Sequence, residues 1–312
     1  MICNYLPQFY QLSKQLALVC LLTPFILPMA NAQNVILIIG DGMDDQQITA
    51  ARNYLHGAQG RTILDTMPIR SAVQVLTVDN EDPTENIYVA DSANSATALA
   101  TGVTTSIGRI ATSAKTDKDL TTIIELAEDQ GFKTGLVTTA SITDATPAAF
   151  AAHVSMRGCE SPELMVQYEA GGDFIVDCEQ DLQANGGLGS ISEQLLMSNV
   201  DVLLGGGLKM FTPLAEGTEK TLLQLAKEHN YHVINNLEQA NDVKPLEKIL
   251  GLFANKHLAV RMQGTDGRIA EQPEFSFLNY FHKYLGTVTL PDEMSCEVNP
   301  VFAAENTPSL KD

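Results

Sequence analysis

The residue best suited to chemistry in this chain is a serine that follows an aspartate, within VADSANSATALATGV at residues 89–103. The small residues after Ser92 predict a helix that begins there, so free N–H groups and the positive end of the helix dipole lie beside its hydroxyl. An anion or a developing alkoxide is stabilised in that position, which makes Ser92 a candidate nucleophile. The alternative is structural, because an aspartate before an alanine-rich helix, here Asp91, is commonly an N-cap.

A carboxylate in NVILIIGDGM, residues 34–43, is a candidate metal ligand. Five aliphatic residues end at Gly40-Asp41-Gly42, and a helix is expected over residues 45–54. This pattern predicts a buried parallel strand with Asp41 at its carboxyl end, where open α/β sheets bind ligands. The alternative, a dinucleotide-binding turn, is disfavoured because the third glycine is missing.

A third polar segment lies within residues 134–160, which are expected to form a strand, a loop and a helix that starts near Pro147. Asp144 and Thr146 are two residues apart, so both can offer oxygen atoms on one side to a hard cation such as Mg²⁺. Thr146 could equally be an N-cap. Arg157, expected about three turns into the helix, could bind two phosphate oxygens, or it could be a solvated surface charge.

These segments, in this order, resemble the alkaline phosphatase family from about residue 34 to about residue 207. The family pattern contains a strand ending in Gly-Asp-Gly-Met, a nucleophilic serine in Asp-Ser-Ala, an Asp-Ala-Thr-Pro loop and an arginine shortly after it. The resemblance implies hydrolysis of phosphate monoesters through a phosphoserine, with two Zn²⁺ ions and one Mg²⁺ ion as cofactors.

The resemblance also assigns roles to individual residues. It implies that Asp41 bridges one zinc and the magnesium, and that Ser92 contacts zinc and attacks phosphorus. Thr146 would ligate magnesium, with Asp144 in or next to the same shell. Arg157 would hold the phosphoryl oxygens. Two further residues, Asp91 and His153, would support the site from behind, with His153 on the helix that follows Asp144.

The family's remaining zinc ligands come from an ordered series of motifs, Glu-Gly followed by two Asp-His pairs and a last lone His. This series is not present, because the 312 residues contain no Asp-His pair. His229 and His232, three residues apart, are expected at the surface near the end of a helix over residues 218–229. We therefore expect negligible phosphatase activity from this chain, as an incomplete form of the family fold. The alternatives are a catalytically inactive remnant that binds phosphate weakly and another hydrolase of the same superfamily.

Three cysteines follow the first 32 residues. Cys159 and Cys178 bracket a short acidic loop after Arg157 and are expected to pair in an oxidising compartment, which is worth about 3 kcal/mol in the loop-entropy model. Cys296 is then left over. The resemblance suggests a partner further along the chain, and the alternative is a buried free thiol.

The first 32 residues predict a signal peptide, because Lys14 precedes an apolar run over residues 16–29 and the small residues Ala30-Asn31-Ala32. We expect a periplasmic or secreted protein; a retained membrane anchor is the alternative. The formal net charge of -19 disfavours nucleic acid and anionic membranes as partners. The expected partners are phosphate monoesters, and the resemblance suggests a homodimer.

Apolar runs alternate with amphipathic segments, which predicts an α/β fold: a doubly wound, mostly parallel sheet with flanking helices. One domain is expected from residue 33 to 312, with residues 264–312 rich in loops or starting a peripheral insert. The expected elements are a helix around Leu120–Ala127 that stops at Gly131, strands over 134–139, 201–207 and 232–234, and helices over 191–197 and 218–229. Gly205, Gly206 and Gly207 are expected to allow a tight turn rather than to bind phosphate.

Overall fold

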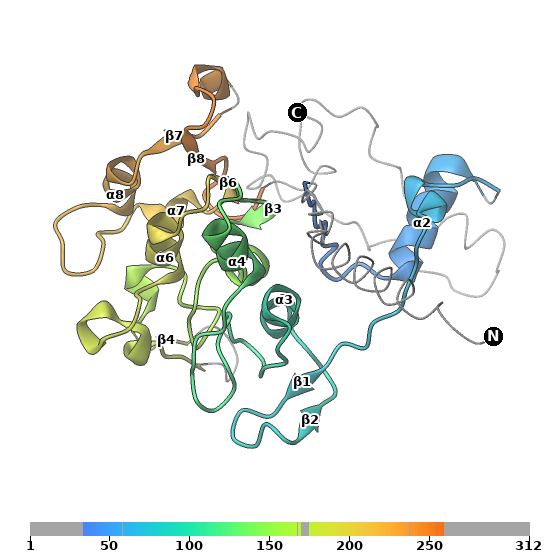
Figure 1. Cartoon of the computed structure of the whole chain (residues 1–312), viewed down its shortest axis with the longest axis horizontal. Coiled ribbons are helices and arrows are strands. Elements are labelled where there is room, and N and C mark those ends of the chain that lie inside the picture. The colour runs from blue at the N-terminus through green and yellow to red at the C-terminus, as the bar shows by residue number, and fades with distance from the viewer. Residues whose placement is uncertain (1–33, 58, 167, 170–174, 237, 259–312) are drawn as a thin grey trace, which may run out of the picture. The chain divides into compact units, whose positions relative to one another are not determined.

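The computed structural model describes residues 34–57, 59–166, 168–169, 175–236 and 238–258 (Figure 1). It divides into two units, residues 1–43 and residues 44–312, and each is described by itself. The predicted signal peptide, Cys296 and the predicted loop-rich region at 264–312 lie outside the described residues. Among the described helices, none has the length and apolar character needed to cross a membrane.

Residues 34–40, in the first unit, do not form the predicted buried strand. Most of their side chains are exposed, Val35 by 90% and Ile38 by 86%. A strand, unlike a helix, takes its hydrogen bonds from neighbouring segments, and none of the described sheets includes these residues. The apolar run shows only that burial would be favourable, so the prediction of a strand from this run alone was wrong for the described structure.

The second unit begins with α2 (Asp45–His56), close to the predicted helix. Its N-cap is Asp44, whose carboxylate accepts hydrogen bonds from the N–H groups of Gln46 and Gln47. None of its residues is buried. Short elements follow: η1 (Ile63–Thr66) and the antiparallel pair β1 (Thr77–Val78) and β2 (Asn86–Ile87).

A four-stranded parallel sheet forms the centre of the second unit, which confirms the predicted α/β class. Its order is β3-β6-β8-β7, with β3 (Gly135–Ser141), β6 (Val202–Gly206), β8 (Lys248–Leu252) and β7 (Tyr231–Ile234). β3, β6 and β7 match the predicted strands within two residues. β8 was not predicted, because KILGL is a short apolar run without turn signals that distinguish strand from helix.

The helices between the strands begin at side-chain caps. α4 (Ile123–Asp129), α6 (Ile191–Met197) and α8 (Leu222–Glu228) start after Thr122, Ser190 and Thr221, each of which accepts a hydrogen bond from a backbone N–H in the first turn. α8 is therefore shorter than the predicted helix over 218–229. α7 (Leu208–Phe211) starts at Gly207, whose φ of 95° favours glycine and provides the predicted turn.

Two helices made largely of alanine carry the candidate site residues. α3 (Ser92–Thr101) and α5 (Ala145–Ala148) pack against each other. Their buried residues include Ala93, Ala96 and Ala148. Small side chains allow the two backbones to approach closely, which places the N-termini of both helices in one region.

Between α5 and α6 the chain forms short pieces only. These are η2 (Pro162–Leu164), the antiparallel pair β4 (Tyr168–Glu169) and β5 (Ile175–Val176), η3 (Glu179–Asp181) and η4 (Gln183–Asn185). One more 3-10 helix, η5 (Glu238–Asp242), precedes β8. Residues of η3 return to the segment that follows α5 and contact it near Arg157.

Candidate active site

Ser92 is the first residue of α3, as predicted, and Asp91 is the N-cap. The Asp91 carboxylate accepts the Asn94 N–H at 3.0 Å, while the Asn94 side chain accepts the Asp91 N–H at 2.9 Å. This reciprocal pair sets the direction in which the chain enters the helix. The N-cap interpretation of Asp91 is therefore correct, and it is compatible with a reactive serine, because the cap uses the aspartate and leaves the serine hydroxyl for other contacts.

Arg157 lies beside Ser92. Its Nη1 donates to Ser92 Oγ at 2.7 Å and to Asp91 Oδ2 at 3.3 Å, and its Nη2 donates to Asp144 Oδ1 at 2.9 Å. The Arg157 side chain is 32% exposed. It carries five N–H donors, and its described contacts use three, so donors remain for an anion that approaches from solvent.

The prediction that one helix carries both His153 and Arg157 is wrong. α5 ends at Ala148, Val154 pairs with Ile110 in an isolated antiparallel bridge, and Arg157 lies in a turn. Two backbone hydrogen bonds of 3.1 Å between Ile110 and Val154 hold this segment in an extended form. Tertiary pairing overrides the helix propensity of the alanine-rich sequence.

Asp144 and Thr146 stand at the start of α5. Asp144 is the N-cap and accepts the Ala145 N–H at 2.8 Å, whereas Thr146 lies inside the helix and is not a cap. Both side chains are half-buried. Hydroxyl and carboxylate oxygens are the donors that Mg²⁺ prefers, so the chemistry of this pair fits the predicted magnesium shell.

Two groups next to Asp144 were not predicted. The carboxylate of Glu160 accepts a hydrogen bond from the Thr143 hydroxyl at 2.5 Å, and burial raises its pKa. His257 Nδ1 accepts the Ser141 N–H at 3.1 Å and lies 3.9 Å from Asp144 Oδ2. The two residues come from a loop after Arg157 and a loop after β8, so no local motif could have placed them near Asp144.

His153 supports a neighbouring segment rather than contacting Ser92. Its side chain is 9% exposed, with Nδ1 3.0 Å from the Ala111 carbonyl oxygen and Nε2 3.1 Å from Glu125 Oε1. Burial pushes the pKa of Glu125 up, but hydrogen bonds from the Thr122 N–H and from His153 hold it below its ordinary value. His153 thus packs under the loop near residue 111, which agrees with the predicted packing role.

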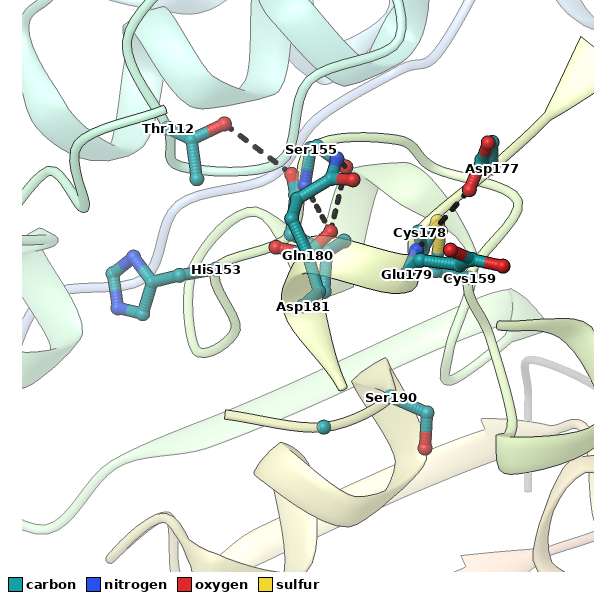
Figure 2. Close-up of a disulfide and its surroundings, with 12 residues drawn as sticks. Thr112, His153, Ser155, Cys159, Asp177, Cys178, Glu179, Gln180, Asp181 and Ser190 are labelled. Atoms are coloured by element: carbon teal, nitrogen blue, oxygen red, sulfur yellow. Dashed lines mark hydrogen bonds between the residues drawn. A yellow bond between two sulfur atoms is a disulfide. The ribbon is translucent and has the colours of Figure 1, made fainter. Parts of the chain in front are cut away.

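Cys159 and Cys178 form the predicted disulfide, shown in Figure 2. Both residues are fully buried. Cys159 is two residues after Arg157, so this cross-link bears directly on the segment that positions the guanidinium. Asp181 lies within 4.8 Å of the sulfur atoms, but the two sulfurs are bonded to each other.

Comparison with known proteins assigns the chain to a family. A family model described as alkaline phosphatase matches residues 32–309. The chain belongs to the alkaline phosphatase family. The resemblance drawn from the three motifs is thereby confirmed.

Known alkaline phosphatases and a related phosphatase are similar to this chain. Streptomycin-6-phosphate phosphatase of Streptomyces griseus is 43% identical over 238 residues, which cover 75% of this chain and 50% of the relative. Alkaline phosphatase of Escherichia coli is 41% identical over 243 residues, with 75% and 49% covered. The chain spans about half the length of the curated relatives it matches.

Solved structures agree with the fold. A cold-active alkaline phosphatase from a psychrophilic Shewanella sp. matches with a TM-score of 0.51 and 29% identity, over 72% of this chain and 46% of the other. Alkaline phosphatase of Thermus thermophilus matches with a TM-score of 0.50 and 26% identity, over 72% and 40%.

The resemblance implies zinc ions, and the ligands that would hold them stay a prediction for this chain. Zinc prefers nitrogen and sulfur ligands in a closed or nearly closed shell. In the described residues, the one group of three His, Cys, Asp or Glu with all ligand atoms within 4.8 Å contains the disulfide sulfurs. His229 is exposed and His232 lies 3.6 Å from Glu247, so neither forms a ligand cluster with the other.

Asp41, in the first unit, lies in a turn after residues 34–40 and is exposed. Its predicted place at the end of a buried strand is not found, because no strand precedes it. The bridging role that the resemblance gives to Asp41 stays a prediction.

Proposed function

We propose that Ser92, Arg157 and Asp144 belong to a phosphomonoesterase site in which Ser92 is the nucleophile. The observation that carries the proposal is the 2.7 Å contact between Arg157 Nη1 and Ser92 Oγ at the N-terminus of α3. A guanidinium and the positive end of a helix dipole both favour the anionic form of a hydroxyl. The same two features attract a phosphate group.

The chemistry that follows is transfer of the phosphoryl group to Ser92. Ser92 Oγ forms a bond to phosphorus and the bond from phosphorus to the ester oxygen breaks. The proton lost by the Ser92 hydroxyl is balanced by the proton gained by the ester oxygen, so the group leaves as an alcohol. The free N–H donors of Arg157 hold the non-bridging oxygens, which carry the charge of the transition state. Hydrolysis of the phosphoserine by water would complete the cycle and release inorganic phosphate.

The magnesium part of the site is proposed for Asp144 and Thr146. A bound Mg²⁺ would supply positive charge that stabilises the phosphoryl oxygens. Asp144 also accepts a hydrogen bond from Arg157, so it orients the guanidinium from the side of the predicted cation.

The decisive experiment measures phosphate binding and turnover on the same purified chain. We expect calorimetry to detect binding of inorganic phosphate, weakened about tenfold or more by Arg157→Ala because charged hydrogen bonds are lost. Arg52→Ala is the matched control, since Arg52 is also held by a carboxylate, that of Asp65, at 2.7 Å. It should leave the affinity unchanged.

Turnover of p-nitrophenyl phosphate with added Zn²⁺ and Mg²⁺ tests the second half of the proposal. Turnover that disappears in Ser92→Ala but persists in Ser95→Ala would support the nucleophile and contradict the predicted inactivity of this chain. Phosphate binding without turnover would support the site and the predicted inactivity together. A chain that shows no phosphate binding and no turnover would contradict the proposed function.

We also propose a periplasmic or secreted location and a homodimer. The disulfide supports the location, because disulfides persist in oxidising compartments. The homodimer rests on family resemblance. Fractionation of the native host and light scattering of the purified chain test the two proposals.

A further inference from the structure

The segment that carries Arg157 is held at both ends by one short stretch of chain. Ser155 lies two residues before Arg157, and Cys159 lies two residues after it. Ser155 contacts Asp181, and Cys159 is bonded to Cys178. Figure 2 shows both connections, Ser155 with Asp181 and Cys159 with Cys178.

The contact at Ser155 is a double one. Asp181 Oδ2 accepts the Ser155 N–H at 3.0 Å and the Ser155 hydroxyl at 2.6 Å. Gln180 Nε2 adds a third hydrogen bond, to Ser155 Oγ at 2.6 Å. Ser155 is 7% exposed, so a lost acceptor would leave buried donors without a partner.

The geometry between the two ends leaves Arg157 little freedom. Its N–H donates to the Gly108 carbonyl oxygen at 2.6 Å, and Cys159 N–H donates to the Met156 carbonyl oxygen at 3.1 Å. The side chain is then shared among Ser92, Asp91 and Asp144. Backbone position is therefore set from outside the site, and guanidinium position follows from it.

We propose that Asp181, acting through Ser155, is a positioning residue for Arg157, and that the disulfide is the second fixed point of the same brace. Burial raises the pKa of Asp181 despite its bonds to Ser155, so the fold keeps this acceptor at an energetic cost. The value of the brace for phosphate binding rests on the proposed function. The effect of Asp181 and the disulfide on the position of Arg157 does not depend on the proposed function.

The test uses the full chain with Asp181→Ala, which removes both accepted hydrogen bonds and leaves the disulfide. Asp181→Asn is the conservative variant, because its amide oxygen can still accept them. Asp177→Ala is the matched control: Asp177 lies in the same stretch, is exposed, and accepts only the Glu179 N–H, at 3.2 Å. Ser155→Ala and Ser155→Thr form a second pair that removes and keeps the hydroxyl.

Two readouts are needed. The first is the rate at which phenylglyoxal modifies Arg157, measured by mass spectrometry, with buried Arg109 in the same sample as reference for the whole fold. The second is the dissociation constant of inorganic phosphate. We expect Asp181→Ala to accelerate modification at Arg157 several-fold over Arg109 and to weaken phosphate binding about tenfold. Ser155→Ala should act in the same direction, and Asp181→Asn, Ser155→Thr and Asp177→Ala should resemble the unaltered chain.

Each outcome either supports or overturns the positioning role of Asp181. Unchanged modification of Arg157 in both Asp181→Ala and Ser155→Ala would overturn the proposal. An equal increase in the modification rates of Arg157 and Arg109 in both variants would also overturn it, because it would mean that the whole fold is loosened. Selective acceleration at Arg157 in a chain that does not bind phosphate would support the brace and count against the proposed function, so the two failures are distinguishable.

Discussion

The segment with Asp41 and the segment with Ser92 carry equally recognisable motifs, but the first ends in a turn and the second begins a capped helix. Residues 34–40 expose most of their apolar side chains and form no strand. Ser92 and Asp144, by contrast, stand at capped helix starts within the second unit. These caps join residues no more than three positions apart, whereas a strand depends on hydrogen bonds to another segment of the chain. Motifs built on caps can therefore position chemistry by themselves.

The largest difference in stability between the two segments is expected when the contact between α3 and α5 is overpacked. Ala148 is fully buried, so Ala148→Leu should lower the free energy of unfolding by about 1–3 kcal/mol, measured by urea denaturation. Ile38→Ala is the counterpart in the other segment. Ile38 is 86% exposed, and its loss should change stability by no more than about 0.5 kcal/mol. A large loss with Ile38→Ala would mean that the apolar run is buried in solution.

Removing the N-cap should have different effects on the stability of α3, which is buried, and of α2, which is exposed. Asp91→Ala should lower the free energy of global unfolding by about 1 kcal/mol, because α3 is part of the core. Asp44→Ala removes a similar cap from α2, which buries no residue, and should fray that helix alone. Hydrogen exchange at α2 and the unfolding midpoint measure the two effects. Equal shifts of the midpoint would contradict the distinction.

The smallest effect concerns pH. Burial raises the pKa of Asp181 above its value in the unfolded chain, which is about 3.9. The folded state then binds the proton more tightly than the unfolded chain does, so protonation of Asp181 stabilises the fold. This stabilisation is complete below the unfolded pKa and disappears as pH rises through the folded pKa. The unaltered chain should therefore gain stability relative to Asp181→Asn as pH falls from 7 towards about 4. Thermal midpoints of the two chains over this range check the sign, and a parallel pair of curves would contradict it.

Sequence patterns predict the elements whose signals are local. α6 has its predicted bounds because Ser190 and Glu193 form a capping box in front of an apolar stripe. Ser92 and Asp144 are found by motif for the same reason. The helix predicted through Arg157 is wrong because pairing with Ile110 is not visible in the segment itself.

The rest of the site depends on contacts across long stretches of chain. Glu160 and His257 meet Asp144 only after the loops beyond α5 and β8 are folded. The hydrogen bonds of Asp181 to Ser155 join residues 26 positions apart. Neither residue type nor spacing marks these partners, so a single sequence cannot identify them.

The position of β8 in the sheet has a consequence for biosynthesis. β8 is the last of the four strands to leave the ribosome, but it lies between β6 and β7. β7 is therefore translated before the only described strand with which it pairs, and at about 5–20 residues per second it waits on the order of a second or more for β8. During that interval its hydrogen-bonding edge is open to other nascent chains or to a chaperone. A ribosome that pauses between residues 234 and 248 would prolong this vulnerable state, so codon usage over those positions bears on the yield of folded protein.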